Sequence, residues 1–264
     1  MKPINATRWL TAAAMATTLV LSACGGSSSD APETRDTAYG KVQGVDDGAK
    51  SGTYYWKGIP FAQAPAGALR WKAPVAPTAW KDTLQATQFG ASCIQNPRMY
   101  SPGNANTFDA SVGDNILSGH TPGSEDCLSL NIWRPATKEK NLPVIVFIYG
   151  GSNITGYSAD PLYDGAALAK KANAVVVSAN YRLGQLGFFR HPALRDTAVD
   201  PTLTPEDQSG NFAVLDIIQA LKFVQGNIEH FGGNKANVTL AGQSAGAINV
   251  LAVLTTPGNR AAGL

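Results

Sequence analysis

The segment that most constrains this chain is a serine between glycines, within residues 231–246, which read FGGNKANVTLAGQSAG. A β-rich run at 238–241 leads into the pattern G-x-S-x-G at 242–246, and residues 247–254 are helical in character. Strand, glycine-flanked serine and helix in this order predict a nucleophile elbow. Both glycines are needed because a Cβ two positions from a sharply turned serine would crowd the neighbouring strand and helix. We therefore expect Ser244 to project its hydroxyl from the top of a sheet.

Apolar patterns upstream predict the rest of that sheet. Residues 144–149 are an unbroken apolar run, typical of a strand buried on both faces, and residues 174–179 predict a second buried strand. Residues 162–171 are helical in character, and apolar residues at three- and four-residue spacing predict an amphipathic helix within 211–230. The alternation of strand and helix predicts an α/β fold whose parallel, doubly wound sheet has right-handed crossovers.

The chain before this region reads differently. Residues 37–80 are short β-like runs broken by Gly and Pro, of which 39–44 and 52–58 predict a small N-terminal antiparallel β region. Residues 125–133 alternate as a strand does. Arg70, in a Pro-rich stretch, is expected to form a buried structural ion pair.

The first residues indicate export. Lys2 and Arg8 precede an Ala-, Leu-, Val- and Thr-rich run, so residues 1–23 are interpreted as a signal peptide. The run ends in Leu-Ser-Ala-Cys, which resembles a bacterial lipobox and implies cleavage before Cys24 and lipidation of its thiol. The alternative is an ordinary signal peptide with an incidental cysteine. Residues 24–36 then form a flexible tether, and the chain is expected on the bacterial, in particular the outer, membrane, or in the periplasm or medium if the lipobox is not used.

Charge and cysteine usage narrow the partners. The net charge of +2 falls to zero without the two basic leader residues, so nothing points to nucleic acid. In an exported chain, the two cysteines other than Cys24, Cys93 and Cys127, are expected to form one disulfide. Two thiols without nearby histidines do not complete a metal site, and we expect neither a metal nor a cofactor.

Several motifs then occur in the order typical of one family. Residues 125–132 (EDCLSLNI) and 231–246 resemble the two signatures of the type-B carboxylesterases, which include cholinesterase-like and bile-salt-lipase-like enzymes. Residues 57–62 (KGIPFA), 149–151 (YGG) and 180–184 (NYRLG) support the match. The resemblance covers residues 37–264, and implies the N-terminal part of an α/β-hydrolase domain, truncated after the elbow.

The resemblance implies a serine carboxylic-ester hydrolase. Ser244 would attack a small-molecule ester and form an acyl-enzyme. The amide of Ala245 would be one oxyanion donor by the geometry of the elbow, and the family match puts the others at Gly151 and Ser152.

The chain departs from the family pattern in several places. Ser152 replaces the usual third glycine and Asn153 the aromatic that often follows it, which predicts a narrower or more polar pocket. Gln243 replaces a frequent glutamate, and no Trp lies between the two paired cysteines, so a choline ester is not expected as the preferred substrate.

The triad is incomplete in this sequence. In this fold the acid and the histidine follow the serine, but residues 245–264 contain no His, Asp or Glu, and His120, His191 and His230 all precede Ser244. We expect activity to need a missing C-terminal part, and the chain alone to be inactive. The alternative is a non-catalytic relative of binding or adhesion type, or a truncated pseudoenzyme.

Overall fold

A computed structural model describes residues 32–95 and 123–256. The predicted signal peptide, the lipidation site Cys24, the first part of the predicted tether and His120 lie outside these residues. Within them, no helix is both long and apolar enough to cross a membrane.

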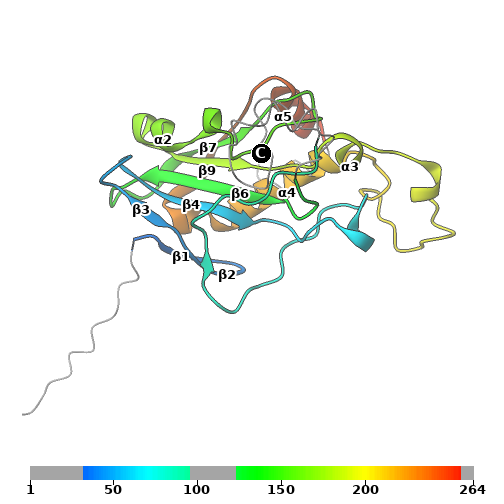
Figure 1. Ribbon diagram of the computed structural model, residues 1–264, viewed down its shortest axis with the longest axis horizontal. Helices are drawn as coiled ribbons and strands as arrows, with labels where there is room; N and C mark the ends of the chain where they lie inside the picture. The colour runs from blue at the N-terminus through cyan, green and yellow to red at the C-terminus, as the bar shows by residue number, and fades with distance from the viewer. Residues whose placement is uncertain (1–31, 96–122, 257–264) are drawn as a thin grey trace, which may run out of the picture.

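The centre of the molecule is a mixed six-stranded sheet (Figure 1). Its order is β3-β4-β6-β8-β7-β9; the β3/β4, β4/β6 and β6/β8 pairs are antiparallel, whereas β7 pairs in parallel with both β8 and β9. The predicted parallel sheet is therefore confined to the second half, and part of the predicted antiparallel region extends the same sheet. The strands are β3 (Val45–Asp47), β4 (Thr53–Pro60), β6 (Ser129–Pro135), β7 (Leu142–Ile148), β8 (Val175–Ala179) and β9 (Gly233–Gly242).

A second, three-stranded sheet has the order β1-β2-β5, with β1 (Thr34–Thr37), β2 (Gly40–Gln43) and β5 (Leu84–Gln85). β1 and β2 are antiparallel. Residues 34–36, assigned to the tether from sequence, thus belong to a strand, because their backbone groups pair with those of β2.

Helices lie on both faces of the main sheet (Figure 1). Helix α4 contributes more buried side chains to the main core than any other element, while α2 packs on the other face near Trp133 and Val176. The helices are α2 (Ala166–Ala172), α3 (Gly184–Gly187), α4 (Phe212–Asn227) and α5 (Ala245–Thr255), with 3₁₀ turns at Gly67–Leu69, Pro161–Tyr163, Pro192–Leu194 and Ile228–Phe231.

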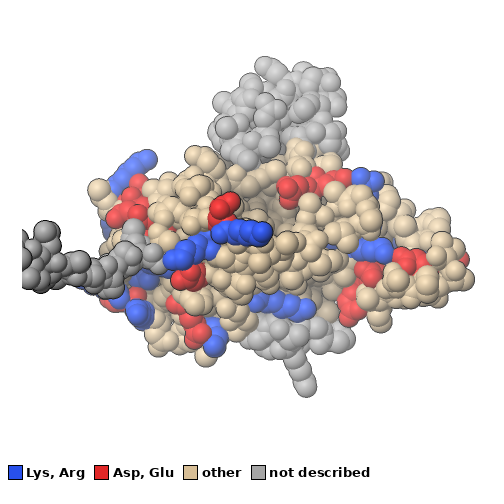
Figure 2. All heavy atoms as spheres, turned by 90° about the horizontal axis from the view of Figure 1, so that it is seen from below, with Lys and Arg blue, Asp and Glu red and all other residues tan. Residues whose placement is uncertain are grey.

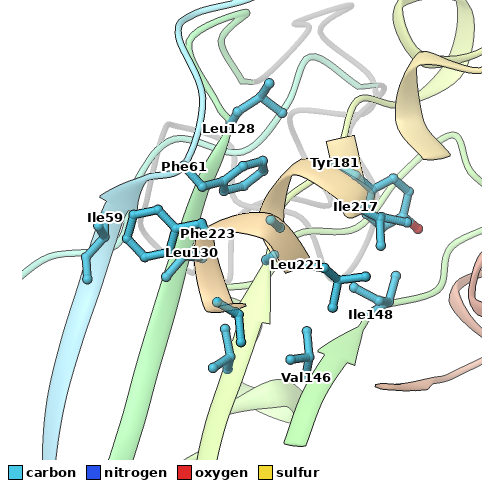
Figure 3. Close-up of a cluster of buried hydrophobic side chains, with 14 of the residues drawn as sticks. Ile59, Phe61, Leu128, Leu130, Val146, Ile148, Tyr181, Ile217, Leu221 and Phe223 are labelled. Carbon is cyan, nitrogen blue, oxygen red and sulfur yellow. The ribbon is translucent and has the colours of Figure 1, made fainter. Parts of the chain in front are cut away.

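The core lies between α4 and one face of the sheet (Figure 3). Ile217, Leu221 and Phe223 of α4 point toward Leu130 of β6 and Val146 of β7, and all five are at most 2% exposed. Burial of such side chains stabilises the fold by about 1.5–3 kcal/mol each. The core thereby holds β7 and β9, which carry the loops of the candidate site, in fixed register.

The predicted burial of β7 on both faces is wrong. Val144, Val146 and Ile148 are buried, but Ile145 and Phe147 between them are only partly covered. Ile145 pairs with Val176 of β8, which lies on the sheet face that α2 covers. Helix α2 packs mainly on β4, β6 and β8, however, so it leaves this face of β7 less covered. By contrast, every residue of β8 is buried, as its apolar run predicted.

Two ion pairs tie the loops to this framework. Arg182 and Asp216 form a bidentate pair with side chains 3% and 0% exposed. Arg70 forms the predicted ion pair, with Glu125, but its side chain is 41% exposed, so the expectation of burial was wrong. The hydrogen-bonded Arg70 guanidinium lowers the pKa of Glu125.

Figure 2 shows acidic and basic side chains interspersed on the face that it presents.

Candidate active site

Ser244 occupies the sharp turn that the sequence predicts. It lies between β9 and α5 with φ 54° and ψ −125°, a left-handed backbone that strains any residue with a Cβ. A Cβ on Gly242 would lie 2.6 Å from the carbonyl carbon of Gly246, and one on Gly246 would collide with the carbonyl oxygens of Ile148 and Tyr149. The two glycines are therefore required by close backbone packing on both sides of the serine.

A loop after β7 faces this turn. Gly150 packs so closely that a Cβ there would lie 2.8 Å from Ser244 Cβ and 2.5 Å from the carbonyl oxygen of Gln243. The next three residues all have positive φ: 124° at Gly151, 56° at Ser152 and 59° at Asn153. These backbone angles are part of a tight loop whose residues Gly151 and Ser152 line the same cleft as Ser244.

Backbone donors converge at this place. Gly151 and Ser152 line the same cleft as Ser244, and Ala245 is the first residue of α5. Over residues 32–95 and 123–256, the N–H groups of Gly151, Ser152 and Ala245 donate no hydrogen bond. The structure thus brings the nucleophile candidate into one cleft with the amides of Gly151 and Ser152, which can still donate to a ligand oxygen.

The cleft has a volume of about 380 Å³ and a wall that is partly polar and partly apolar. Asp160, 5% exposed, lines it and accepts a hydrogen bond from the N–H of Leu162; burial raises the pKa of its carboxyl group. Tyr163 donates to Gln243 Oε1 over 3.3 Å. The position before Ser244 therefore presents a neutral amide to the cleft, and the acid that lines the cleft is one that sequence reasoning did not identify.

Comparison with known proteins agrees with this geometry. The model of the carboxylesterase family matches residues 31–264. The chain belongs to the carboxylesterase family. The fold described above is accordingly an α/β-hydrolase fold.

Curated carboxylesterase relatives are considerably longer. The para-nitrobenzyl esterase of Bacillus subtilis (strain 168) is 40% identical over 84% of this chain and 40% of its own length. The fumonisin B1 esterase of Sphingopyxis macrogoltabida is 42% identical, with 84% and 37% covered, and the cholinesterase of Mus musculus 42%, with 84% and 34%. The chain thus spans about two fifths, or less, of the relatives it matches.

Solved carboxylesterase structures match most of this chain. A PNB esterase has a TM-score of 0.73 at 37% identity, covering 88% of this chain and 42% of that one. A carboxylesterase of Geobacillus stearothermophilus has a TM-score of 0.69 at 36% identity, with 87% and 41% covered.

Three side-chain contacts support the loop beside the cleft, and sequence reasoning found none of them. Asn249 of α5 donates to Asn153 Oδ1 over 2.8 Å. Asn153 does not line the cleft but an adjoining hollow, so of the two substitutions only Ser152 can narrow the site. Tyr181 donates to the carbonyl of Tyr149 over 2.7 Å. In the third contact, Gln95 accepts a hydrogen bond from the N–H of Gly156; Gln95 lies two residues after Cys93, which forms a disulfide with Cys127.

The described histidines are not in the cleft. His191 accepts a hydrogen bond from the N–H of Ala193 and stacks on Phe189, and His230 is exposed in the turn after α4. Among the residues that the structure describes, no cluster of three or more His, Cys, Asp or Glu could hold a metal ion.

Proposed function

We propose that this chain carries the nucleophile and the oxyanion hole of a serine carboxylic-ester hydrolase. The observation that carries the proposal is the strained backbone of Ser244 beside free amides in one cleft. Ser244 Oγ attacks the ester carbonyl carbon, the alcohol leaves, and water hydrolyses the resulting acyl-enzyme. The family relatives named as esterases support the reaction class.

The amides of Gly151, Ser152 and Ala245 stabilise the oxyanion in this proposal. Negative charge develops on the carbonyl oxygen as the tetrahedral intermediate forms, and donors that need no rearrangement favour it over the planar ester. Because Ser152 donates through its backbone, its replacement of a glycine leaves the donor in place. Loss of one such donor costs about 3–4 kcal/mol of activation free energy.

A complete triad requires groups from elsewhere. Ser244 is a weak nucleophile at neutral pH without a base, and no histidine is among the described residues that line the cleft. We place the acid and the histidine in a part of the whole protein outside these 264 residues, which span two fifths or less of the curated relatives. By itself the chain should show negligible turnover.

The proposed substrates are carboxylic esters with small or medium acyl groups. The cleft of about 380 Å³ is at the small end of ligand sites, and neutral Gln243 removes a charge that would attract a cation. The lipobox at residues 21–24 supports anchoring of the protein through Cys24 to the bacterial outer membrane.

Labelling with a fluorophosphonate tests the proposal. The probe is applied to the membrane fraction of the source cells and to the purified 264-residue chain, and the labelled peptide is identified by mass spectrometry. We expect label on Ser244 in a membrane protein of about twice the mass of this chain, and none on the Ser244→Ala variant. An abundant, unlabelled protein of that size would instead favour a non-catalytic relative.

A further inference from the structure

We propose that Gln95 is a positioning residue that holds the loop with the oxyanion donors in place, and that the Cys93–Cys127 disulfide fixes the chain segment from which Gln95 reaches this loop. The inference rests on the proposed function of this cleft. Gln95 lies two residues after Cys93, is 4% exposed and reaches across to the loop at residues 151–156.

Both ends of the Gln95 amide are engaged. Its Oε1 accepts from the hydroxyl of Thr155 and from the N–H of Gly156, each over 2.8 Å. Its Nε2 donates over 3.0 Å to the carbonyl of Gly156 and to that of Cys93. One side chain thus satisfies three polar groups of the loop, far along the chain from its own position, and connects them to the disulfide.

These contacts fall where they can control the donors. Thr155 donates through its N–H to the carbonyl of Gly151, and the backbone of Gly151 packs on Thr155 so tightly that a Cβ would collide with its carbonyl oxygen. Gly156 in turn packs on the carbonyl oxygen of Gly150, 2.5 Å from the position of a Cβ. A shift of Thr155 or Gly156 therefore moves the two glycines that face Ser244.

The opposite side of the loop has its own support. Asn153 bonds to Asn249 of α5, and its carbonyl accepts from the N–H of Gly184 over 2.7 Å. The positive φ angles at Ser152 and Asn153 make the loop conformation costly, so it persists only where the surroundings hold it. Gln95 supports the end at residues 155–156, and it is itself tied to the disulfide through its hydrogen bond to the carbonyl of Cys93.

Replacement of Gln95 in the full-length enzyme is the direct test. Gln95→Met keeps the length of the side chain and removes the four hydrogen bonds described above. We expect kcat for a p-nitrophenyl ester to fall by about tenfold to a hundredfold, as for displaced or lost oxyanion donors, with KM changed less than about threefold. The matched control is Gln219→Met, which removes a hydrogen bond from another buried glutamine, to the carbonyl of Phe61, and should leave kcat unchanged.

A second variant guards against misfolding. Thr155→Val removes one donor to Gln95 with almost no change in shape, and should lower kcat by about threefold to tenfold. If the two residues act through each other, the double variant is no slower than Gln95→Met alone. A folded Gln95→Met enzyme with wild-type kcat, or effects that multiply in the double variant, would overturn the proposal.

Hydrogen exchange separates this inference from the proposed function. Exchange at the N–H of Gly156 should be faster in Gln95→Met and unchanged in Gln219→Met, whether or not the protein hydrolyses esters. If the wild-type protein shows no hydrolysis that depends on Ser244, the proposed function fails, and unaltered exchange at Gly156 would separately refute the role of Gln95 as a loop anchor.

Discussion

Gly150→Ala is the substitution that tests the geometry of the cleft most directly. Gly150 does not have a positive φ, so alanine is compatible with its backbone, and only the surrounding space opposes the added methyl group. The new Cβ would lie 2.8 Å from Ser244 Cβ and 2.5 Å from both the carbonyl oxygen and the Oε1 of Gln243. Each of these neighbours belongs to the elbow itself.

The size of the effect follows from these distances. Nonbonded carbon atoms are most stable about 3.5–4.0 Å apart, so the loop and the elbow must separate by about 1 Å. Overpacking of this kind typically destabilises a fold by about 1–3 kcal/mol. A displacement of about 1 Å between reacting groups can cost about a hundredfold in rate, and we expect a loss of that order in the acylation of Ser244.

The assay is the second-order rate of fluorophosphonate labelling of Ser244 in the full-length protein, with the melting temperature measured in parallel. Gly226→Ala is the matched control, because a Cβ at Gly226, on the exposed side of α4, meets nothing within 4 Å. It should label at the wild-type rate and be more stable by about 0.5–1 kcal/mol. Labelling of Gly150→Ala within threefold of wild type, at unchanged stability, would refute the argument that this loop and the elbow are in contact.

Three further predictions concern stability. Reduction of the disulfide, which spans 34 residues, should lower the unfolding free energy by about 3–4 kcal/mol, and equal denaturation curves with and without reductant would contradict this. Arg182→Met leaves the Asp216 carboxylate buried without its partner and should lower the free energy of unfolding by about 3–5 kcal/mol. In urea titrations, the double variant Arg182→Met/Asp216→Leu should recover much of this loss, because it removes the unpaired charge as well. The third prediction concerns pH, because Arg70 lowers the pKa of Glu125. The stability advantage of wild type over Glu125→Gln should be complete above about pH 4.3, the pKa of an unperturbed glutamate, and disappear as the pH falls through the depressed pKa. An advantage that persists in acid would show that charge is not its cause.

Local patterns predicted much of the fold. Helix α4 follows from apolar residues at helical spacing, and β8 from a short β-branched run that is buried throughout. The position of Ser244 between a strand and a helix also follows from local chemistry, because glycines two residues away on both sides are what its strained turn demands. These elements could be predicted from the sequence because the interactions that form them join residues only a few positions apart.

The family resemblance, rather than local pattern, led to Gly151 and Ser152, which the structure brings to the same cleft as Ser244. Sequence reasoning failed where partners are distant along the chain. The half-covered face of β7 depends on where α2 packs, and an apolar run is the same whether one face or both are covered. Asp160 caps the 3₁₀ turn Pro161–Tyr163 and also lines the cleft, and only the first of these roles depends on residues near it in the sequence.

The sequence by itself determined the α/β class, the elbow at Ser244 and the identity of the cysteines that pair. Only the tertiary structure decided that Gln95 supports the loop beside that serine and that Asn249 supports its other side. The physical reason is that a hydrogen bond between side chains 60 or 96 positions apart leaves no periodicity in the sequence. Its existence depends on the packing of the sheet and its helices, which brings the two chain segments together.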